Sequence, residues 1–271
     1  MSTPPLAVTC RGREFRVVDF QPEFWASINA GNWEAETFDL FDACLTPETA
    51  YLDVGSWIGP TLLYAAGRVR CSLGFEPDPT AYRALAANMA LNPQLNPVEI
   101  FPVAIAAQRG QTHMGSSSTP GDSMSSLLFA RESARWPVEL HPIEDYESKL
   151  PAGASVFLKI DIEGGEYALL PALAGFVRRH RPTLYLSLHP HFFMKPWFGR
   201  GRLRQARGEL GLLWQTWRAL RVIRQFPYLY DPAGGRLRPL DLLHRRRWLR
   251  GRGLVLSFAP IPYLENPRPA A

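Results

Sequence analysis

The segment Tyr51-Leu52-Asp53-Val54-Gly55-Ser56-Trp57-Ile58-Gly59-Pro60-Thr61 decides the fold of this chain. Residues 50–54 form a short, mostly apolar run bounded by turn residues, which predicts a buried strand. Glycines follow at positions 55 and 59, and Pro60 suits the first turn of a helix. A strand, a tight loop and a helix in this order form the first unit of a nucleotide-binding α/β sheet, in which a ligand binds at the carboxyl end of the strand.

The spacing of the loop indicates which ligand that is. Dinucleotide-binding proteins carry G-x-G-x-x-G, whose glycines let the backbone approach a pyrophosphate. Here the pattern is D-x-G-x-x-x-G, and Asp53 stands near the place of the first glycine. Its carboxylate would repel a pyrophosphate, and it suits a cofactor with a positive end and no phosphate, such as S-adenosylmethionine (SAM). The alternative is that Asp53 only caps the following helix.

A second acid supports a nucleoside. Glu76 lies 21 positions after Gly55, at the end of a second predicted strand over residues 69–75. An acid in this place accepts hydrogen bonds from the paired hydroxyls of an adenosine ribose. NAD sites use the same device, so the choice of SAM over NAD depends on Asp53 and the wider glycine spacing.

Composition restricts the class of protein. A chain of 271 residues with 46% hydrophobic residues is long enough for one large domain with a sizeable core. Its three cysteines are widely spaced and imply no disulfide framework. No apolar run approaches the roughly 18 residues of a membrane span, and the N-terminus has no signal-peptide pattern. We therefore expect a cytoplasmic protein.

The net charge of +5 is unevenly distributed. Basic residues gather late in the chain, at 178–181, 200–207 and 244–247. Such clusters bind nucleic acid, an acidic glycan or a membrane surface. The simpler interpretation is a solvated, arginine-rich surface.

The remaining pattern alternates strands and helices. Residues 1–13 are expected to lack regular structure, and helices at 22–30 and 33–44 are expected to form an N-terminal cap over the cofactor cleft. Residues 1–47 would be this cap segment and residues 48–271 the single domain that follows. Further strands are predicted at 98–103, 154–162, 183–188, 222–230 and 254–258. Alternating β and α units imply a doubly wound, mostly parallel sheet, and the two late strands suggest an antiparallel edge.

Two further segments stand out in the pattern. Residues 202–221 predict a helix with apolar residues on one face, namely Leu210, Leu213, Trp214, Trp217 and Leu220. The Ser/Gly-rich stretch 115–126 predicts either a lid or binding loop, or a surface loop without such a role.

Three segments carry a resemblance to a known family: Tyr51–Thr61, Gly74–Asn88 and Leu158-Lys159-Ile160-Asp161-Ile162-Glu163-Gly164-Gly165-Glu166. The last has the form K-x-D-x-E-G-x-E, and over about residues 48–190 the chain resembles the FkbM-type SAM-dependent methyltransferases. This resemblance implies a class I methyltransferase fold with a Rossmann-like, seven-stranded sheet. It also implies SAM as cofactor and O-methylation of a hydroxyl on a sugar, a glycan or a secondary metabolite.

Methyl transfer to a hydroxyl requires a positioned acceptor and a base for its proton. The predicted catalytic residues are Asp161, Glu163 and His189, which follow the strands at 154–162 and 183–188; Glu166 and His191 are further candidates. Alternatively, the acids only stabilise a helix start and the histidine is a loop residue. Two carboxylates and a histidine could also hold a divalent metal, but no dense ligand motif is present, so no metal ligand is predicted. The predicted cofactor-binding residues are Asp53, Gly55, Ser56, Trp57, Ile58, Gly59, Thr61, Glu76, Pro77, Ala104 and Asp161.

Two other functions remain open. An NAD-dependent oxidoreductase is disfavoured by Asp53, by the loop spacing and by the lack of a Tyr-x-x-x-Lys pair. A nucleic-acid methyltransferase or binding protein is suggested by the basic C-terminal quarter. However, the base-methylating N/D-P-P-Y/F motif is absent, and Asp161-Ile162-Glu163 stands in its place.

Overall fold

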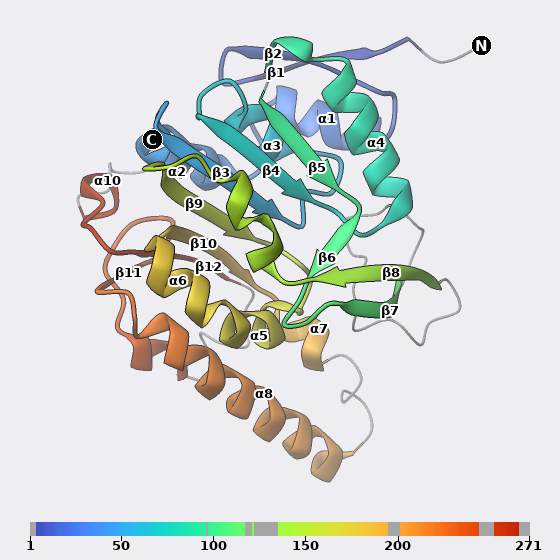
Figure 1. Cartoon of the computed structure of the whole chain (residues 1–271). Helices are drawn as coiled ribbons and strands as arrows, with labels where there is room; N and C mark the ends of the chain where they lie inside the picture. The colour runs from blue at the N-terminus through green and yellow to red at the C-terminus, as the bar shows by residue number, and fades with distance from the viewer. Residues whose placement is uncertain are drawn as a thin grey trace.

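The structure, a computed structural model, describes residues 4–95, 97–116, 121, 135–194, 201–243 and 252–265. Its centre is a seven-stranded sheet with the order β11–β12–β10–β9–β3–β4–β5 (Figure 1). The strands are β3 (Thr49–Val54), β4 (Cys71–Phe75), β5 (Val98–Phe101), β9 (Ser155–Ile160), β10 (Thr183–Leu188), β11 (Tyr228–Tyr230) and β12 (Arg252–Ser257). Strand β12 runs antiparallel to both β10 and β11, and the other paired strands of this sheet are parallel. The predicted doubly wound, mostly parallel sheet is confirmed, with the antiparallel strand one place in from the edge strand β11.

Helices cover both faces of the sheet (Figure 1). One face packs against η3 (Ile143–Lys149), α5 (Glu166–Leu169), η4 (Leu170–Leu173), α6 (Ala174–His180), α8 (Arg202–Ile223) and η6 (Pro239–Leu243). The other face packs against α1 (Pro22–Asn29), α2 (Ala35–Cys44), α3 (Pro60–Ala65), α4 (Pro79–Ala90) and α10 (Pro262–Glu265). Among the described elements, α7 (Pro190–Met194) adds Met194 to the first core and η1 (Pro93–Leu95) adds Leu95 to the second.

The central strand β3 is buried along its whole length, as its apolar sequence predicts. Successive side chains of a strand point to opposite faces. Ala50, Leu52 and Val54 therefore enter the core on the α5 side, and Tyr51 enters the core on the α2 side. Asp53 falls on the same face as Tyr51, at the carboxyl end of the strand, which places one charged side chain inside the molecule.

The N-terminal segment contains the two expected helices and a β-hairpin as well. Strands β1 (Leu6–Cys10) and β2 (Arg13–Val17) pair antiparallel, so the expectation that residues 1–13 lack regular structure was wrong. The hairpin turns at Arg11 and Gly12, both with positive φ. The side-chain amides of Asn88 and Asn92 accept hydrogen bonds from the N–H groups of Val18 and Arg16, which fixes the hairpin to the rest of the fold.

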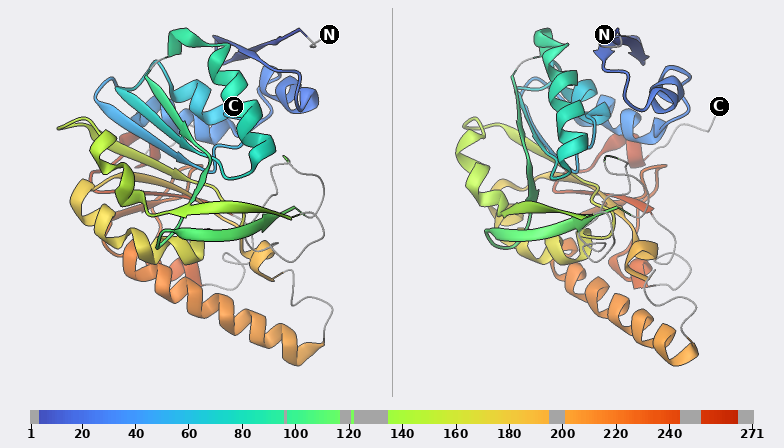
Figure 2. Two further views of the ribbon diagram at one scale, coloured as in Figure 1. Left: turned by 45° about the vertical axis from the view of Figure 1, so that its right-hand side comes forward. Right: turned by 90° about the vertical axis from the view of Figure 1, so that its right-hand side faces the viewer.

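The predicted strand at 98–103 is divided in two. Pro102 has no N–H to donate, so β5 ends before it and β6 (Val103–Ile105) begins after it. Strand β6 joins β7 (Gly110–Gly115) and β8 (Arg135–His141) in a small second sheet, which the sequence did not predict (Figure 2). The predicted Ser/Gly-rich loop lies mostly outside the described residues; its residues Ser116 and Gly121 are described.

Helix α8 occurs where the sequence predicts it, but its predicted apolar face points outward. Leu220 is buried, whereas Leu210, Leu213, Trp214 and Trp217 are exposed. The helix also extends to Ile223, so the predicted strand at 222–230 is reduced to β11. Within the described part of the chain, no helix has both the length and the apolar character needed to cross a membrane.

Candidate active site

The loop between β3 and α3 lies against the end of β9. Gly55 has φ +88°, and a Cβ added there would lie 1.9 Å from the carbonyl oxygen of Asp161. Gly59 has φ +93°, and a Cβ there would lie 2.6 Å from Cδ1 of Leu85 in α4. Contact with the backbone of Asp161 therefore requires a glycine at 55, and the positive φ favours a glycine at 59, whatever ligand binds.

A cavity of about 610 Å³ opens at the carboxyl ends of β3, β4 and β9. Its apolar wall includes Phe75, Val103, Ile105 and Met114. The predicted cofactor-binding residues that line it are Gly55, Trp57, Glu76, Pro77, Ala104 and Asp161.

Glu76 is the buried acid of this cavity, with only 5% of its surface exposed. Its carboxylate accepts hydrogen bonds from the N–H groups of Trp57 (2.8 Å) and Asp78 (2.7 Å). Burial raises the pKa of Glu76 to about 8, although these two N–H groups oppose the shift. The side chain is thus held in one orientation on the wall of the cavity.

A second, more polar cavity of about 720 Å³ shares Gly55, Trp57, Asp161 and Glu163 with the first. The predicted residues Ser56, Thr61 and His189 line it, together with Lys159 and Ser187. The N-terminal segment contributes Phe24, Trp33 and Glu34 to its wall.

Trp57 lies on the wall shared by the two cavities. Its indole Nε1 donates a hydrogen bond to the carbonyl of Gly121 (2.9 Å), whose N–H donates to the Asp78 carboxylate (2.9 Å). This described residue of the Ser/Gly-rich stretch is therefore attached to the site.

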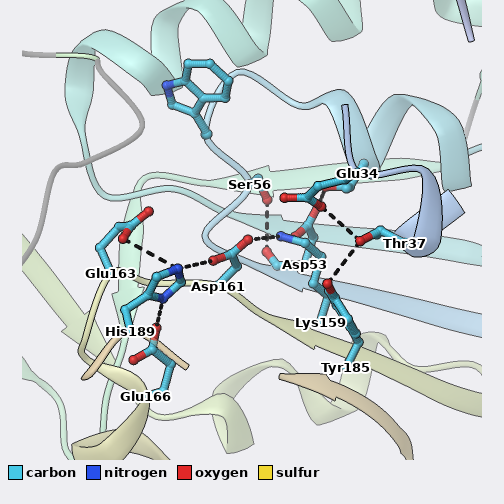
Figure 3. Close-up of polar contacts among 12 residues, drawn as sticks. Glu34, Thr37, Asp53, Ser56, Lys159, Asp161, Glu163, Glu166, Tyr185 and His189 are labelled. Carbon is cyan, nitrogen blue, oxygen red and sulfur yellow. Dashed lines mark hydrogen bonds and ion pairs between the residues drawn. The ribbon is translucent and has the colours of Figure 1, made fainter. Parts of the chain in front are cut away.

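A row of polar side chains crosses three neighbouring strands beneath the polar cavity. Lys159 on β9 is in register with Asp53 on β3 and with Tyr185 on β10. The Lys159 ammonium lies 3.4 Å from Asp53 and 3.4 Å from Asp161 (Figure 3). Burial alone would lower the pKa of Lys159, but these carboxylates outweigh burial and raise it. Asp53 is fully buried, accepts from the Thr61 hydroxyl (2.7 Å), and lines neither cavity.

His189 brings the three predicted catalytic residues together. Its Nε2 lies 3.6 Å from Asp161 and 3.7 Å from Glu163 (Figure 3). On the other side of the ring, Nδ1 lies 2.7 Å from the buried carboxylate of Glu166. Burial alone would lower the pKa of His189, but Glu166, Asp161 and Glu163 outweigh it and raise the pKa to about 9. Burial also raises the pKa of Glu163 to about 7.

Glu166, named from the sequence only as a further candidate, lies directly beside His189. It is fully buried at the start of α5 and fixes the orientation of the His189 ring. The signal for it was present, because Glu166 is the last acid of the K-x-D-x-E-G-x-E pattern. Its partner 23 residues later is not visible from spacing alone.

The same cluster has the donor set of a cation site. Asp161, Glu163 and His189 each offer one ligand atom, and these atoms all lie within 4.8 Å of one another. Carboxylate and imidazole ligands suit several divalent cations. That no metal binds remains a prediction.

Besides Asp53, the predicted cofactor-binding residues Ile58 and Gly59 also lie away from both cavities. Ile58 is fully buried, and its carbonyl accepts a hydrogen bond from the Asn88 side chain (2.8 Å). Gly59 begins α3 and packs against α4. Both hold the loop in place, and their contact with a cofactor remains a prediction.

Residues 53–216, more than half of the chain, match the sequence profile described as the Methyltransferase FkbM domain. No curated protein sequence matches the chain.

Similar solved structures include three methyltransferases. An FkbM methyltransferase from Methylobacillus flagellatus KT is 19% identical, covering 51% of this chain and 32% of its own, with a TM-score of 0.37. A SAM-dependent methyltransferase from Agrobacterium tumefaciens is 13% identical (69% and 53% covered, TM-score 0.35). An rRNA methylase from Streptococcus thermophilus is 8% identical (82% and 95% covered, TM-score 0.39). The chain thus spans about a third of the length of the Methylobacillus structure.

Proposed function

The chain belongs to the Methyltransferase FkbM domain family and has a class I methyltransferase-like fold, and on that premise we propose that it transfers the methyl group of SAM to a hydroxyl of a sugar, a glycan or a secondary metabolite. The observation that carries the proposal is the wall shared by the two cavities. On one side lies an apolar pocket containing a buried acid, and on the other side lies a polar pocket containing a histidine and several carboxylates.

The apolar cavity suits the adenosine part of SAM. Phe75, Ile105 and Met114 provide apolar contacts for a base, and the Glu76 carboxylate accepts from paired ribose hydroxyls. This role of Glu76 is the one predicted from its place at the end of β4.

The charge of the site suits a cationic cofactor. Five carboxyl groups lie around the shared wall with only two cations, Lys159 and His189; they are Glu34, Asp53, Asp161, Glu163 and Glu166. Burial raises the pKa of Glu34, Asp53 and Glu163, so the negative charge of this group increases with pH. An excess of negative charge attracts a sulfonium and an ammonium group and repels the pyrophosphate of NAD. When bound, SAM would supply an activated methyl group with a neutral thioether as leaving group.

The polar cavity suits the acceptor. Its residues would position a hydroxyl and remove its proton, the two tasks that methyl transfer leaves to the protein. We assign removal of the hydroxyl proton to Asp161 first. Asp161 lines both cavities and lies beside both His189 and Lys159. Glu163 and His189 are the neighbouring candidates, and Glu166 orients His189.

The N-terminal segment fits the role of a cap. The family match begins at Asp53, yet Phe24, Trp33 and Glu34 line the polar cavity. We assign residues 1–47 to a cap that helps to select the acceptor, and residues 48–271 to the methyltransferase domain.

Calorimetric titration tests the cofactor. SAM should bind in the micromolar range, on the order of −7 to −8 kcal/mol, whereas NAD should give no binding heat. Tight binding of NAD without binding of SAM would reject the proposal. The same titration with the demethylated product should also show binding, because the adenosine contacts are unchanged.

Substitution of Asp161 tests the chemistry. Asp161→Asn keeps the size of the side chain and removes its charge, so turnover should fall by about 10²–10⁴ while SAM affinity changes by less than about tenfold. An acceptor must first be found by screening sugar and polyketide hydroxyls. Normal turnover of Asp161→Asn together with an inactive His189→Ala variant would move the base to His189. Loss of wild-type activity with a chelator, restored by a divalent metal, would show that the cluster acts through a cation.

A further inference from the structure

Helix α8 carries most of the large apolar side chains that are exposed in the described part of the chain. Six large apolar side chains are exposed in the described part of the chain, and five of them lie on α8: Leu203 (84%), Leu210 (65%), Leu213 (40%), Trp214 (57%) and Trp217 (42%). The sixth, Leu240, lies in η6, which packs against α8. Soluble proteins rarely leave such side chains in one contiguous group unless the group contacts a partner.

These side chains form a stripe on the side of α8 that faces away from the core. Leu203, Leu210, Trp214 and Trp217 follow one another at spacings of seven, four and three residues, which places them on one face of a helix. The opposite face carries the buried residues Leu212 and Ala219. Figure 1 shows α8 along the outer edge of the molecule, with no other labelled element beyond it.

Positive charge surrounds the stripe. Helix α8 contains five arginines and one glutamate. Arg204, Arg207 and Arg221 are exposed, and the guanidinium of Arg221 lies over the ring of Trp217 at 4.4 Å. A partner of this face must therefore offer an apolar region that the leucine and tryptophan side chains can enter, together with negatively charged groups that the arginines can contact.

The basic surface continues past the C-terminal end of α8. Arg178, Arg181 and Arg224 line an open cleft beside Phe258. Within the described ranges, none of these three arginines forms an ion pair with a carboxylate. Three arginines without acidic partners provide further charge for phosphate groups.

We propose that the outer face of α8 binds the surface of an anionic phospholipid bilayer. Leucine and tryptophan side chains on one helix face enter the boundary between headgroups and acyl chains, and flanking arginines contact the headgroup phosphates. Tryptophan is enriched at this boundary because its ring is apolar and its N–H is polar. The convex ridge of a single helix fits a broad surface.

Two other partners fit the same face less well. Exposed leucines contribute nothing to base stacking, and the rings of Trp214 and Trp217 already stack on each other at 4.9 Å. Nucleic acid is therefore disfavoured. A second copy of the chain would bring the arginines of two α8 helices together, and like charges in an interface oppose association.

The surface lies one helix away from the proposed active site. His189 directly precedes α7, and Phe193 of α7 contacts α8 at Gly211. An acceptor attached to a membrane would therefore reach the enzyme close to the polar cavity.

Vesicle flotation of the full chain tests the proposal. The chain should float with vesicles of phosphatidylcholine and phosphatidylglycerol, and much less with phosphatidylcholine alone. Arg207→Glu should weaken binding by roughly 5- to 30-fold, since each basic charge near an anionic surface contributes about 1 kcal/mol. Arg83→Glu is the matched control, because Arg83 is exposed on α4, away from α8, and should leave binding unchanged. The double variant Trp214→Ser and Trp217→Ser should also lose binding while retaining its melting temperature.

Several outcomes would overturn the proposal that α8 binds a membrane surface. Failure of the wild-type chain to float with anionic vesicles overturns the proposal, as does equal binding by Arg207→Glu and Arg83→Glu. Binding of a single-stranded oligonucleotide that needs Trp214 and Trp217, without vesicle binding, would make the face a nucleic-acid surface. Self-association in sedimentation that the same variants abolish would make it an interface between copies. SAM binding is expected to be unchanged in all of these variants, so failure here leaves the proposed methyl transfer untouched.

Discussion

Lys159 connects the two sequence motifs of the site. It is 3% exposed and lies between Asp53, which comes from the glycine loop, and Asp161, which belongs to the same motif as Lys159. A buried carboxylate is costly without a partner, and removing one member of a buried pair typically costs about 3–5 kcal/mol. The lysine of K-x-D-x-E-G-x-E therefore allows Asp53 to be charged inside the fold. Asp53 lines neither cavity, so we expect any effect of Asp53 on a cofactor to pass through Lys159 and Thr61.

Glu76 should make SAM binding depend on pH. Its pKa in the free protein is about 8, whereas hydrogen bonds donated by two ribose hydroxyls favour the carboxylate and lower the pKa in the complex. Binding therefore releases a proton below about pH 8, and the apparent affinity should fall by up to about tenfold for each unit of pH below that value. Calorimetry across this range measures the effect.

The control for this prediction is Glu76→Gln, which keeps the shape and cannot ionise. It should bind SAM more weakly by about 1.5–3 kcal/mol above pH 8, the usual worth of a hydrogen bond to a charged group. Its affinity should lack the part of the pH dependence that Glu76 causes. Glu163 and His189 titrate nearby, so the contribution of Glu76 is the difference between the pH profiles of SAM affinity for the wild type and for Glu76→Gln. Identical pH profiles would show that Glu76 has only a structural role.

At the scale of elements, the site depends on how closely the β3–α3 loop approaches the end of β9. The N–H groups of Gly55 and Ser56 both donate to the carbonyl of Phe75, and the N–H of Asp161 donates to the carbonyl of Val54. These bonds place the ends of three strands side by side. The catalytic candidates after β9 are thereby held beside the loop.

Gly55→Ala should disrupt this approach. The new Cβ would lie 1.9 Å from the Asp161 carbonyl oxygen and would also have to adopt a positive φ. Gly12→Ala is a matched control, because Gly12 has φ +76° and no atom within 4 Å of an added Cβ. Strain alone should cost Gly12→Ala about 1 kcal/mol, and Gly55→Ala should lose about 2–4 kcal/mol of unfolding free energy. Denaturant titration of the two variants measures both values, and equal losses would show that the contact with Asp161 is not rigid.

For the whole molecule, the sequence predicted the main strands along the chain and a mostly parallel sheet, and it led us to expect a site at the carboxyl ends of the strands. The apolar runs at 50–54 and 183–188 were sufficient to predict these strands, because buried parallel strands have nearly continuous apolar sequences. The meeting of Asp161, Glu163 and His189 followed from their places after two neighbouring strands. Their roles remain predictions.

The structural features that could not be predicted from the sequence depend on contacts between residues far apart in the chain. The period of α8 identifies one apolar face, but it cannot say whether that face turns toward the core or away from it. The N-terminal hairpin is fixed by Asn88 and Asn92, which lie 70 and 76 residues after their partners Val18 and Arg16. The ion pair between Asp53 and Lys159 likewise joins residues that only the sheet register brings together.

The N-terminal segment should be inseparable from the fold. Trp25, Ile28, Phe38, Leu40 and Phe41 are buried in one core with α3 and α4. Burying each contributes about 1.5–3 kcal/mol, which totals about 8–15 kcal/mol. Since whole domains are stable by only about 5–15 kcal/mol, residues 48–271 alone should not fold cooperatively.

Removing residues 1–5, which precede β1, should leave the melting temperature unchanged. Near-ultraviolet circular dichroism and thermal melting compare the three chains. A sharp melting transition for residues 48–271, close to that of the full chain, would show that the cap is a removable module rather than part of the core.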